Sequence, residues 1–423
     1  MTAETRLRTG RRARARRFAC AALCLLVLWT ATVACAAGGS DFIGTEWYQA
    51  ALLRSEMALG NNTRLLDVIR RAQSGEQVTL AVIGGSVTEG AGASTYKECW
   101  ASRLGVRFSQ TYGRGTNVSL INAGVGGTSS PFGWMRYQRD IVDRVPETDP
   151  DGYPDLVVIE FSVNDWQEPT NHRCYESMVR DILAQPNRPA VILLFAVFKN
   201  GWNLQQELRR IGDAYDLMMV SIRDGLYPEI GPHIGMDAFF SDEYHPTSTG
   251  HRMMSDCLMQ AIADAAGQAP AAKDLPADHA PVYGDDFSGI ITLYADQPVA
   301  GFEVSRGGFA GVDSQTYRNT PVGWVCGPNY AHRPGDTAEP LTVTGVFRKC
   351  LVAWKASAEA AFGAAEVYVD NKRVAVLQGA PDKWGQSEVL LALDAKTAAE
   401  HRLEIRVMDP GKRFTVTAIS VVP

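Results

Sequence analysis

The chain has 423 residues, and 46% of them are apolar, which is enough to bury a full core in two or three domains. Its formal net charge is -6, but residues 1–17 hold seven arginines and one glutamate, so the rest of the chain carries about -12. An acidic body without a basic stripe argues against nucleic acid as a partner.

The amino terminus has the pattern of an export leader. Residues 11–17 are basic, residues 18–34 are apolar, and Ala34-Cys-Ala36 offers a small-residue cleavage site. We therefore expect residues 1–37 to be a cleaved signal peptide and the protein to be secreted or held at the cell surface. Two alternatives stay open: a lipoprotein leader with a lipid on Cys35, or an uncleaved anchor. Membrane attachment is expected only through this leader.

Five cysteines follow the leader, so at least one thiol stays unpaired. They are Cys99, Cys174, Cys257, Cys326 and Cys350. The last two are a plausible pair within the carboxyl-terminal part. Because no Cys-x-x-Cys spacing exists, a zinc site is not expected, and we predict no metal and no organic cofactor.

Residues 41–266 alternate between strand and helix patterns. Apolar runs of strand type lie at 78–83, 117–122, 155–161, 190–197 and 217–222. Helical spacing lies between and around them, at 47–59, 64–72, 96–112, 133–145, 172–184, 204–215 and 248–265. This alternation predicts an α/β domain with a flavodoxin-like, doubly wound, five-stranded parallel sheet.

Residues 267–282 form a linker rich in proline and alanine, and residues 283–423 change character. Short strand patterns separated by turn signals such as Asp370-Asn371 predict an all-β sandwich of jelly-roll type. The expected strands are 290–294, 299–304, 350–355, 366–369, 373–377, 389–393, 403–407 and 415–421. Trp324, Trp354 and Trp384 suit either core packing, which we favour, or a sugar-stacking platform.

Polar clusters directly follow three of the five parallel strands. Ser86 comes after Gly84-Gly85, a glycine-rich loop spans residues 123–130, and Asn164-Asp165 follows the third strand. The carboxyl ends of parallel strands meet at one edge of a sheet, where open α/β folds bind their ligands. Asp242 and His245 follow the last strand and can fold over this edge.

The spacing of Asp242 and His245 suits a proton relay. One turn of chain sets the carboxylate against the imidazole Nδ1 and leaves Nε2 for a serine. Taken alone, Asp-x-x-His is usually structural, and Asn164-Asp165 is equally typical of a turn or a helix cap. It is their joint appearance in this order, each beyond a strand, that predicts ester chemistry.

Other titratable residues compete for a role at this edge. His251 is the rival base, but its place inside the final helix favours a structural role. We expect His172 and His233 to be solvated and Asp165 to support the Asn164 loop. Glu89 suits either the wall of the site or the solvated surface.

Taken together, these motifs resemble the SGNH (GDSL-type) hydrolase superfamily over about residues 76–265. The resemblance implies a nucleophile, an orienting acid, a base and three oxyanion donors. The nucleophile would be Ser86, the orienting acid Asp242 and the base His245. The three oxyanion donors would be the Ser86 N–H, the Gly127 N–H and the Asn164 side chain. Gly126 replaces Gly127 if the register differs by one residue.

Two positions depart from the family pattern. Gly85 stands where Gly-Asp-Ser has aspartate, and Ser162 stands where Gly-x-Asn-Asp has glycine. Both are supporting positions, so the departures bear on the fine geometry of the site rather than on the roles of its residues.

The resemblance implies a serine esterase that works through an acyl-Ser86 intermediate. An exported family member with an appended β-sandwich looks like a carbohydrate esterase that removes acyl groups, such as acetyl, from a polysaccharide. Three alternatives remain open: a sugar O-acyltransferase, a lipase or thioesterase of the same family, and a non-catalytic glycan-binding protein on this fold.

Overall fold

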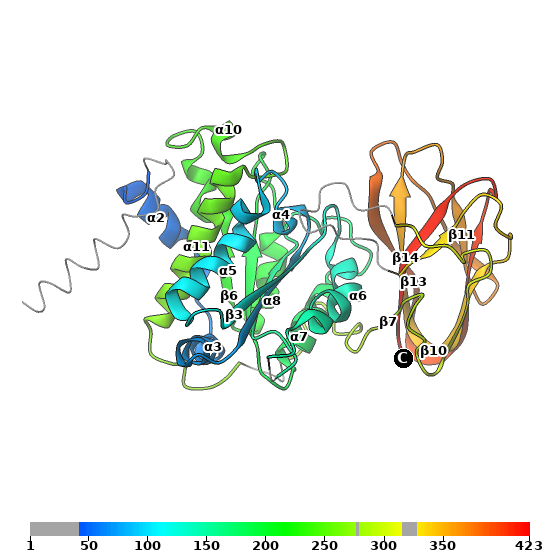
Figure 1. The fold of residues 1–423 in the computed structure, drawn as a ribbon, viewed down its shortest axis with the longest axis horizontal. Helices are drawn as coiled ribbons and strands as arrows, with labels where there is room; N and C mark the ends of the chain where they lie inside the picture. Colours follow the sequence, from blue (N-terminus) through cyan, green and yellow to red (C-terminus); the bar gives the residue numbers. More distant parts are fainter. Residues whose placement is uncertain (1–41, 150, 276–278, 315–327) are drawn as a thin grey trace, which may run out of the picture. The chain divides into compact units, whose positions relative to one another are not determined.

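Two β-sheets organise the protein, one parallel and one antiparallel (Figure 1). The structure is a computed structural model that describes residues 42–149, 151–275, 279–314 and 328–423. Residues 50–423 form one compact unit. The leader with Cys35, as well as Trp324 and Cys326, lies outside the described residues. No helix within the described ranges is long and apolar enough to cross a bilayer.

The first sheet has the strand order β1-β6-β5-β4-β2-β3. Its strands are β1 (Glu56–Ala58), β2 (Val78–Gly84), β3 (Val118–Gly124), β4 (Leu156–Glu160), β5 (Ala190–Phe195) and β6 (Met218–Ser221). All pairings from β3 across to β6 are parallel. The predicted five-stranded, flavodoxin-like sheet is therefore confirmed.

A sixth, short strand extends the sheet, which the sequence did not predict. β1 pairs with β6 in antiparallel fashion, where a helix over residues 47–59 was expected. The helix α2 (Glu46–Ser55) stops just before it. Because the apolar spacing continues through β1, periodicity alone does not show where the helix ends.

Helices cover both faces of this sheet, as a doubly wound fold requires (Figure 1). One face carries α3 (Thr63–Ser74), α5 (Trp100–Tyr112) and α11 (Ser248–Ala266), and the other carries α6 (Ser130–Asp140), α7 (Arg173–Leu183) and α8 (Gln205–Ala214). The short helices are α4 (Ser86–Glu89), η1 (Tyr96–Glu98), η2 (Val142–Arg144), α9 (Ile222–Gly225), η3 (Tyr227–Glu229) and α10 (Met236–Phe239).

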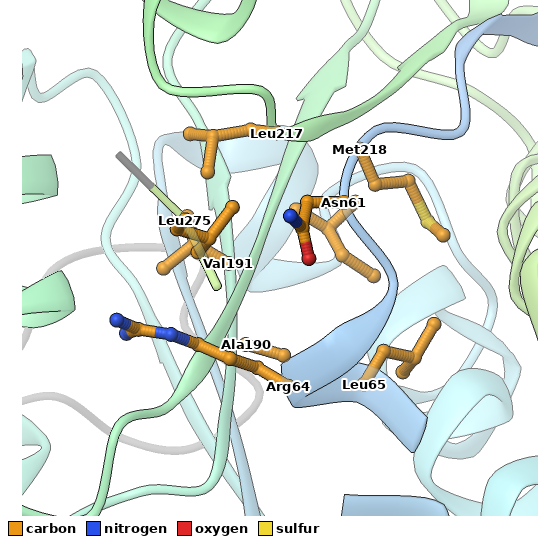
Figure 2. A pocket seen from close by; sticks show the side chains of 9 residues that line it. Asn61, Arg64, Leu65, Ala190, Val191, Leu217, Met218 and Leu275 are labelled. Atoms are coloured by element: carbon orange, nitrogen blue, oxygen red, sulfur yellow. The ribbon is translucent and has the colours of Figure 1, made fainter. Parts of the chain in front are cut away.

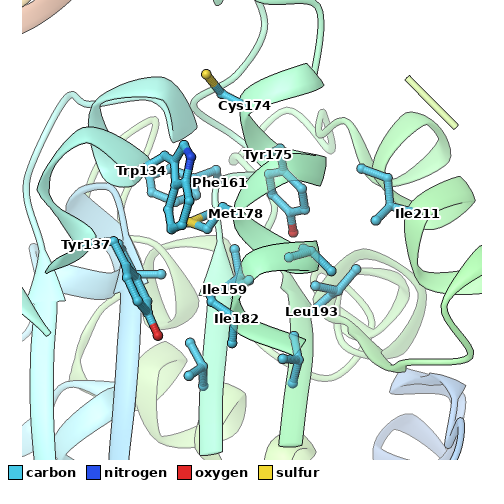
Figure 3. Close-up of a cluster of buried hydrophobic side chains, with 14 of the residues drawn as sticks. Trp134, Tyr137, Ile159, Phe161, Cys174, Tyr175, Met178, Ile182, Leu193 and Ile211 are labelled. Carbon is cyan, nitrogen blue, oxygen red and sulfur yellow. The ribbon is translucent and has the colours of Figure 1, made fainter. Parts of the chain in front are cut away.

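The core beneath α6 and α7 is continuous and apolar (Figure 3). Ile159 and Leu193 point from β4 and β5 toward Trp134 and Met178 of these helices, and all four are buried. Every residue of β2, β4 and β5 is buried. The uninterrupted apolar strands are what fix this sheet as a central, two-sided layer.

Among the described residues, the second sheet joins eight antiparallel strands in one network, with the main order β12-β11-β13-β10-β14-β7. The strands are β7 (Ile291–Leu293), β8 (Phe302–Ser305), β9 (Tyr330–His332), β10 (Leu341–Ser357), β11 (Ala365–Val369), β12 (Lys372–Leu377), β13 (Trp384–Val407) and β14 (Phe414–Val422). Bulges interrupt the pairing of β10 with β13, and the network encloses its own buried core. The predicted all-β domain is confirmed.

The two sheets also share buried surface. Leu351 and Val422 of the all-β part belong to the same apolar cluster as the α6 and α7 residues. The Trp134 Nε1–H donates to the Phe287 carbonyl at 2.9 Å, and the Arg173 guanidinium donates to Asp394 at 2.9 Å. Cys350, considered above as a partner of Cys326, is a buried free thiol in the separate core of the all-β part.

Candidate active site

Ser86 stands at the carboxyl end of the parallel sheet. It is the first residue of α4, which begins two residues after β2 ends. The residue between them, Gly85, packs against Asn164: a Cβ on Gly85 would lie 2.3 Å from the Asn164 Oδ1. The turn from strand to helix therefore sets the serine and the Asn164 amide on either side of a residue that has no side chain.

Asp242 and His245 form a relay to this serine. The His245 Nε2 lies 2.9 Å from the Ser86 Oγ, and its Nδ1 lies 2.8 Å from the Asp242 Oδ2. The backbone N–H groups of Tyr244 and His245 donate to the Asp242 Oδ1 at 2.7 and 2.9 Å. Partial burial opposes the charge on Asp242, but these hydrogen bonds outweigh it and hold its pKa below the usual value.

The loop that carries His245 is held on both sides. The Ser241 N–H donates to the His245 carbonyl at 2.9 Å, and Phe240 forms a β-bridge with Pro246. Gly92, in the segment after α4, lies so close that a Cβ there would be 2.1 Å from the Pro246 carbonyl oxygen. Close packing against the nucleophile's own loop thus fixes the position of the imidazole.

The glycine-rich loop after β3 lies on the other side of Ser86. A Cβ on Gly126 would be 3.6 Å from the Ser86 Cβ, and Gly127 has a positive φ of 67°. A Cβ on Gly127 would be 3.0 Å from the ring of Trp384, which belongs to β13. The loop therefore passes between the nucleophile and the all-β part of the chain.

The rival histidines lie elsewhere. His251 is fully buried in α11, where its Nδ1 accepts from the Trp100 N–H at 3.3 Å and its Nε2 donates to the Ala91 carbonyl at 2.9 Å. Burial lowers the pKa of His251 to about 4. This histidine supports the fold, as the sequence predicts. His233 is exposed, whereas His172 is only partly exposed.

Buried polar groups support the loops of the site from below. Asp165 accepts the Ser130 N–H at 2.7 Å and so ties the Asn164 loop to the start of α6. Burial raises the pKa of Asp165 well above its usual value. Ser162 donates to the Ala196 carbonyl at 3.2 Å, so the hydroxyl at the second departure from the family pattern bonds to the backbone after β5.

Residues 82–253 match the GDSL-like lipase/acylhydrolase family model. The match spans the segments that hold Ser86, Asn164, Asp242 and His245, in the order that this family uses. The α/β domain is that of a GDSL-type serine ester hydrolase.

Solved structures match this GDSL-type hydrolase across both of its sheets. A two-domain esterase named CEX, active on acetylated mannans and co-crystallised with mannopentaose, is 25% identical, with a TM-score of 0.73. The match covers 88% of this chain and 97% of that one. A second structure of a two-domain CEX esterase is 24% identical, with the same TM-score, over 88% and 98% of the two chains. No curated protein matches the chain.

Two features near the site of the hydrolase could not be predicted from the sequence: the burial of one acid and the exposure of one tryptophan. Glu89, expected at the site wall or the solvated surface, is 1% exposed beneath the Gly126 loop. Trp384, favoured as a core residue, is 39% exposed beside Gly127, whereas Trp354 packs against the all-β core. Both positions depend on contacts between segments far apart in the chain, which no local pattern encodes.

The small pocket in Figure 2 lies away from this site. Ala190 begins β5 and Met218 begins β6, so the pocket they line lies at the opposite edge of the sheet. Its volume of about 10 Å³ accommodates no more than one water molecule. No group of three or more metal-binding side chains occurs among the residues that the structure describes.

Proposed function

We propose that this hydrolase is an exported carbohydrate esterase that removes acyl groups, acetyl above all, from a polysaccharide through an acyl-Ser86 intermediate. The observation that carries the chemistry is the relay from Ser86 through His245 to Asp242, with 2.9 and 2.8 Å between the participating atoms.

The relay suits acyl transfer in two halves. The Ser86 Oγ attacks the ester carbonyl while the His245 Nε2 takes the serine proton. His245 then returns that proton to the departing sugar oxygen, which leaves the acyl group on Ser86. Water attacks the acyl-serine with His245 again as base, and the carboxylic acid is released. Asp242 holds the imidazole orientation and stabilises the imidazolium that forms in each half.

Three donors are proposed to bind the oxyanion of each tetrahedral intermediate. They are the N–H groups of Ser86 and Gly127 and the Asn164 side chain. The hydrogen bond from the Gly126 N–H to the Glu89 carboxyl supports Gly127 rather than Gly126, because it already engages the earlier amide.

Exposed aromatic residues around the site support a sugar substrate. Trp384 contacts Gly127, Tyr244 precedes the base, and Trp166 follows Asn164 by two residues; their exposed fractions are 39%, 55% and 64%. Large exposed aromatic faces at a reactive centre are typical of ligand binding. CEX, the solved two-domain match, is active on acetylated mannans, so acetylated mannan is the first polysaccharide to test.

Export is proposed from the leader pattern of residues 1–37 alone. Mass spectrometry of the protein from its native cells tests it: cleavage after Ala36 or nearby supports a signal peptide, and a lipid on Cys35 supports the lipoprotein alternative. Finding the intact amino terminus in the cytoplasm would exclude export.

The chemistry is tested by measuring acetate release from acetylated mannan and hydrolysis of p-nitrophenyl acetate. We expect Ser86→Ala and His245→Ala to lower kcat by about 10³-fold or more on both esters. The exposed Ser74→Ala and His233→Ala are the matched controls. Activity that persists in Ser86→Ala would exclude the acyl-serine route. Acetyl transfer to added mannan, instead of free acetate, would indicate the acyltransferase alternative.

A further inference from the structure

A buried carboxyl group lies directly beneath the glycine-rich loop. Glu89 is the last residue of α4, three residues after the nucleophile, and is 1% exposed. Its Oε2 is so close to Gly126 that a Cβ there would be 2.7 Å away, and the Gly126 N–H donates to this carboxyl group. The other oxygen, Oε1, is buried and has no hydrogen-bond partner within the described ranges.

An acid in this position is costly for the fold. Leaving a buried polar oxygen without a hydrogen-bond partner destabilises a protein, because the oxygen loses its hydrogen bonds to water and gains none in return. The charged group that faces Glu89 is Arg136 of α6, but its Nη1 donates to Asp140 at 2.8 Å and its Nη2 to the Gly84 carbonyl at 3.3 Å. Burial therefore dominates and raises the pKa of Glu89 to about 7.

The carboxyl group links the nucleophile to the loop beside it. α4 packs against the end of β3 so closely that a Cβ on Gly124 would be 2.1 Å from the Glu89 nitrogen. The Gly126 Cα in turn faces the Ser86 Cβ. When Glu89 engages the Gly126 N–H, it fixes the peptide plane that precedes Gly126. The backbone dihedral angles of Gly126 then set the direction of the next amide, the Gly127 N–H.

We propose that Glu89 is a positioning residue for the oxyanion hole: by accepting from the Gly126 N–H, its carboxyl group aims the Gly127 N–H at the oxyanion. This inference rests on the proposed esterase function. In this proposal the role of Glu89 depends on a side chain long enough to bring its oxygen to the Gly126 N–H, and not on the charge of that oxygen.

Two substitutions separate the effect of the length of the side chain at position 89 from the effect of its charge. Glu89→Gln keeps the length of the side chain and a carbonyl acceptor but loses the acid. Glu89→Asp keeps the acid but withdraws it from Gly126 by one methylene group. We expect kcat on p-nitrophenyl acetate to stay within about threefold of wild type in the glutamine variant and to fall about 10–10²-fold in the aspartate variant. KM should change little in either, because a misplaced oxyanion donor affects the transition state and not substrate binding.

Inhibition by a phenylboronic acid is the second measurement, since its tetrahedral adduct with Ser86 places an oxygen in the oxyanion hole. Its Ki should rise in Glu89→Asp in parallel with the loss of kcat. Active-site titration gives the concentration of active enzyme by which each kcat is calculated, and the Tm shows whether each variant is folded.

Two results would overturn the proposal: a kcat loss in Glu89→Gln as large as that in Glu89→Asp, or no loss in either. Ser86→Ala assayed alongside separates this failure from failure of the esterase assignment, because only the latter leaves the serine variant active.

Discussion

The residue before the nucleophile has no side chain because Asn164 occupies the space that one would fill. A Cβ on Gly85 would lie 2.3 Å from the Asn164 Oδ1 and 2.7 Å from its Nδ2. The glycine that departs from the family's Gly-Asp-Ser pattern is therefore matched to the amide that we propose as an oxyanion donor. The two positions form one structural unit, although they lie 79 positions apart in the sequence.

Gly85→Ala should displace this amide. We expect the variant to lower kcat on p-nitrophenyl acetate by about 10²-fold, close to the effect of Asn164→Ala, because loss of one oxyanion donor costs about 10²–10³-fold in rate. The double variant should lose little more than either single one, since both act through the same group. Steady-state kinetics of the three proteins provide the test.

Gly235→Ala is the matched control, because the nearest atom to a Cβ there is 3.9 Å away. It should retain wild-type kcat. Fully multiplicative losses in the Gly85→Ala/Asn164→Ala variant would contradict a shared mechanism and would assign Gly85 a separate role.

At the scale of elements, the parallel strands could be predicted to within one or two residues. Each is a short apolar run bounded by glycine or polar residues, and burial on both faces keeps that run uninterrupted. The polar residues that follow these strands could be placed at one sheet edge because the carboxyl ends of parallel strands meet there. This is why the closeness of Ser86 and His245 could be predicted, whereas the burial of Glu89 could not.

The long strand β13 shows where sequence patterns stop being informative. The predicted strands 389–393 and 403–407 are two parts of this one strand. Between them, residues 397–400 are exposed, so they carry no apolar alternation. Pairing with β10 holds them in strand geometry, for example Ala399 with Phe347. Tertiary pairing, which no local window contains, therefore decides the length of this element.

The end of β4 carries a second buried acid, which makes stability depend on pH. Glu160 is fully buried and accepts from the Thr88 Oγ1 at 3.1 Å. Burial raises the pKa of Glu160 to about 7, from 4.5 for an exposed group. A raised folded-state pKa contributes stability that is fully present below pH 4.5 and is lost as the pH rises through 7.

Glu160→Gln removes this ionisation while keeping the shape of the side chain. We expect the Tm of the variant, relative to wild type, to rise by about 3 °C or more between pH 5 and pH 8. Thermal unfolding of both proteins across this range tests it. The exposed Glu359→Gln should show a constant difference. A Tm difference for Glu160→Gln that falls with pH would contradict the assignment.

At the scale of the molecule, the all-β part is an integral part of the hydrolase unit. Buried residues of β10 and β14 complete the core beneath α6 and α7. Across the same boundary, Arg173 donates to Asp394, and this hydrogen bond, with a further one from Lys349, lowers the pKa of Asp394 to about 2 against its partial burial. These contacts hold the first residue of β13, Trp384, beside the Gly127 loop.

Trp384→Ala therefore tests whether the all-β part selects the substrate. We expect the ratio of kcat/KM on acetylated mannan to kcat/KM on p-nitrophenyl acetate to fall about three- to tenfold, because a stacked ring contributes about 0.5–1.5 kcal/mol and the small ester has no sugar to stack. Met408→Ala, which removes another exposed apolar side chain of the all-β part, should leave the ratio unchanged. Equal losses on both esters in Trp384→Ala would mean that the indole supports the Gly127 loop and does not bind sugar.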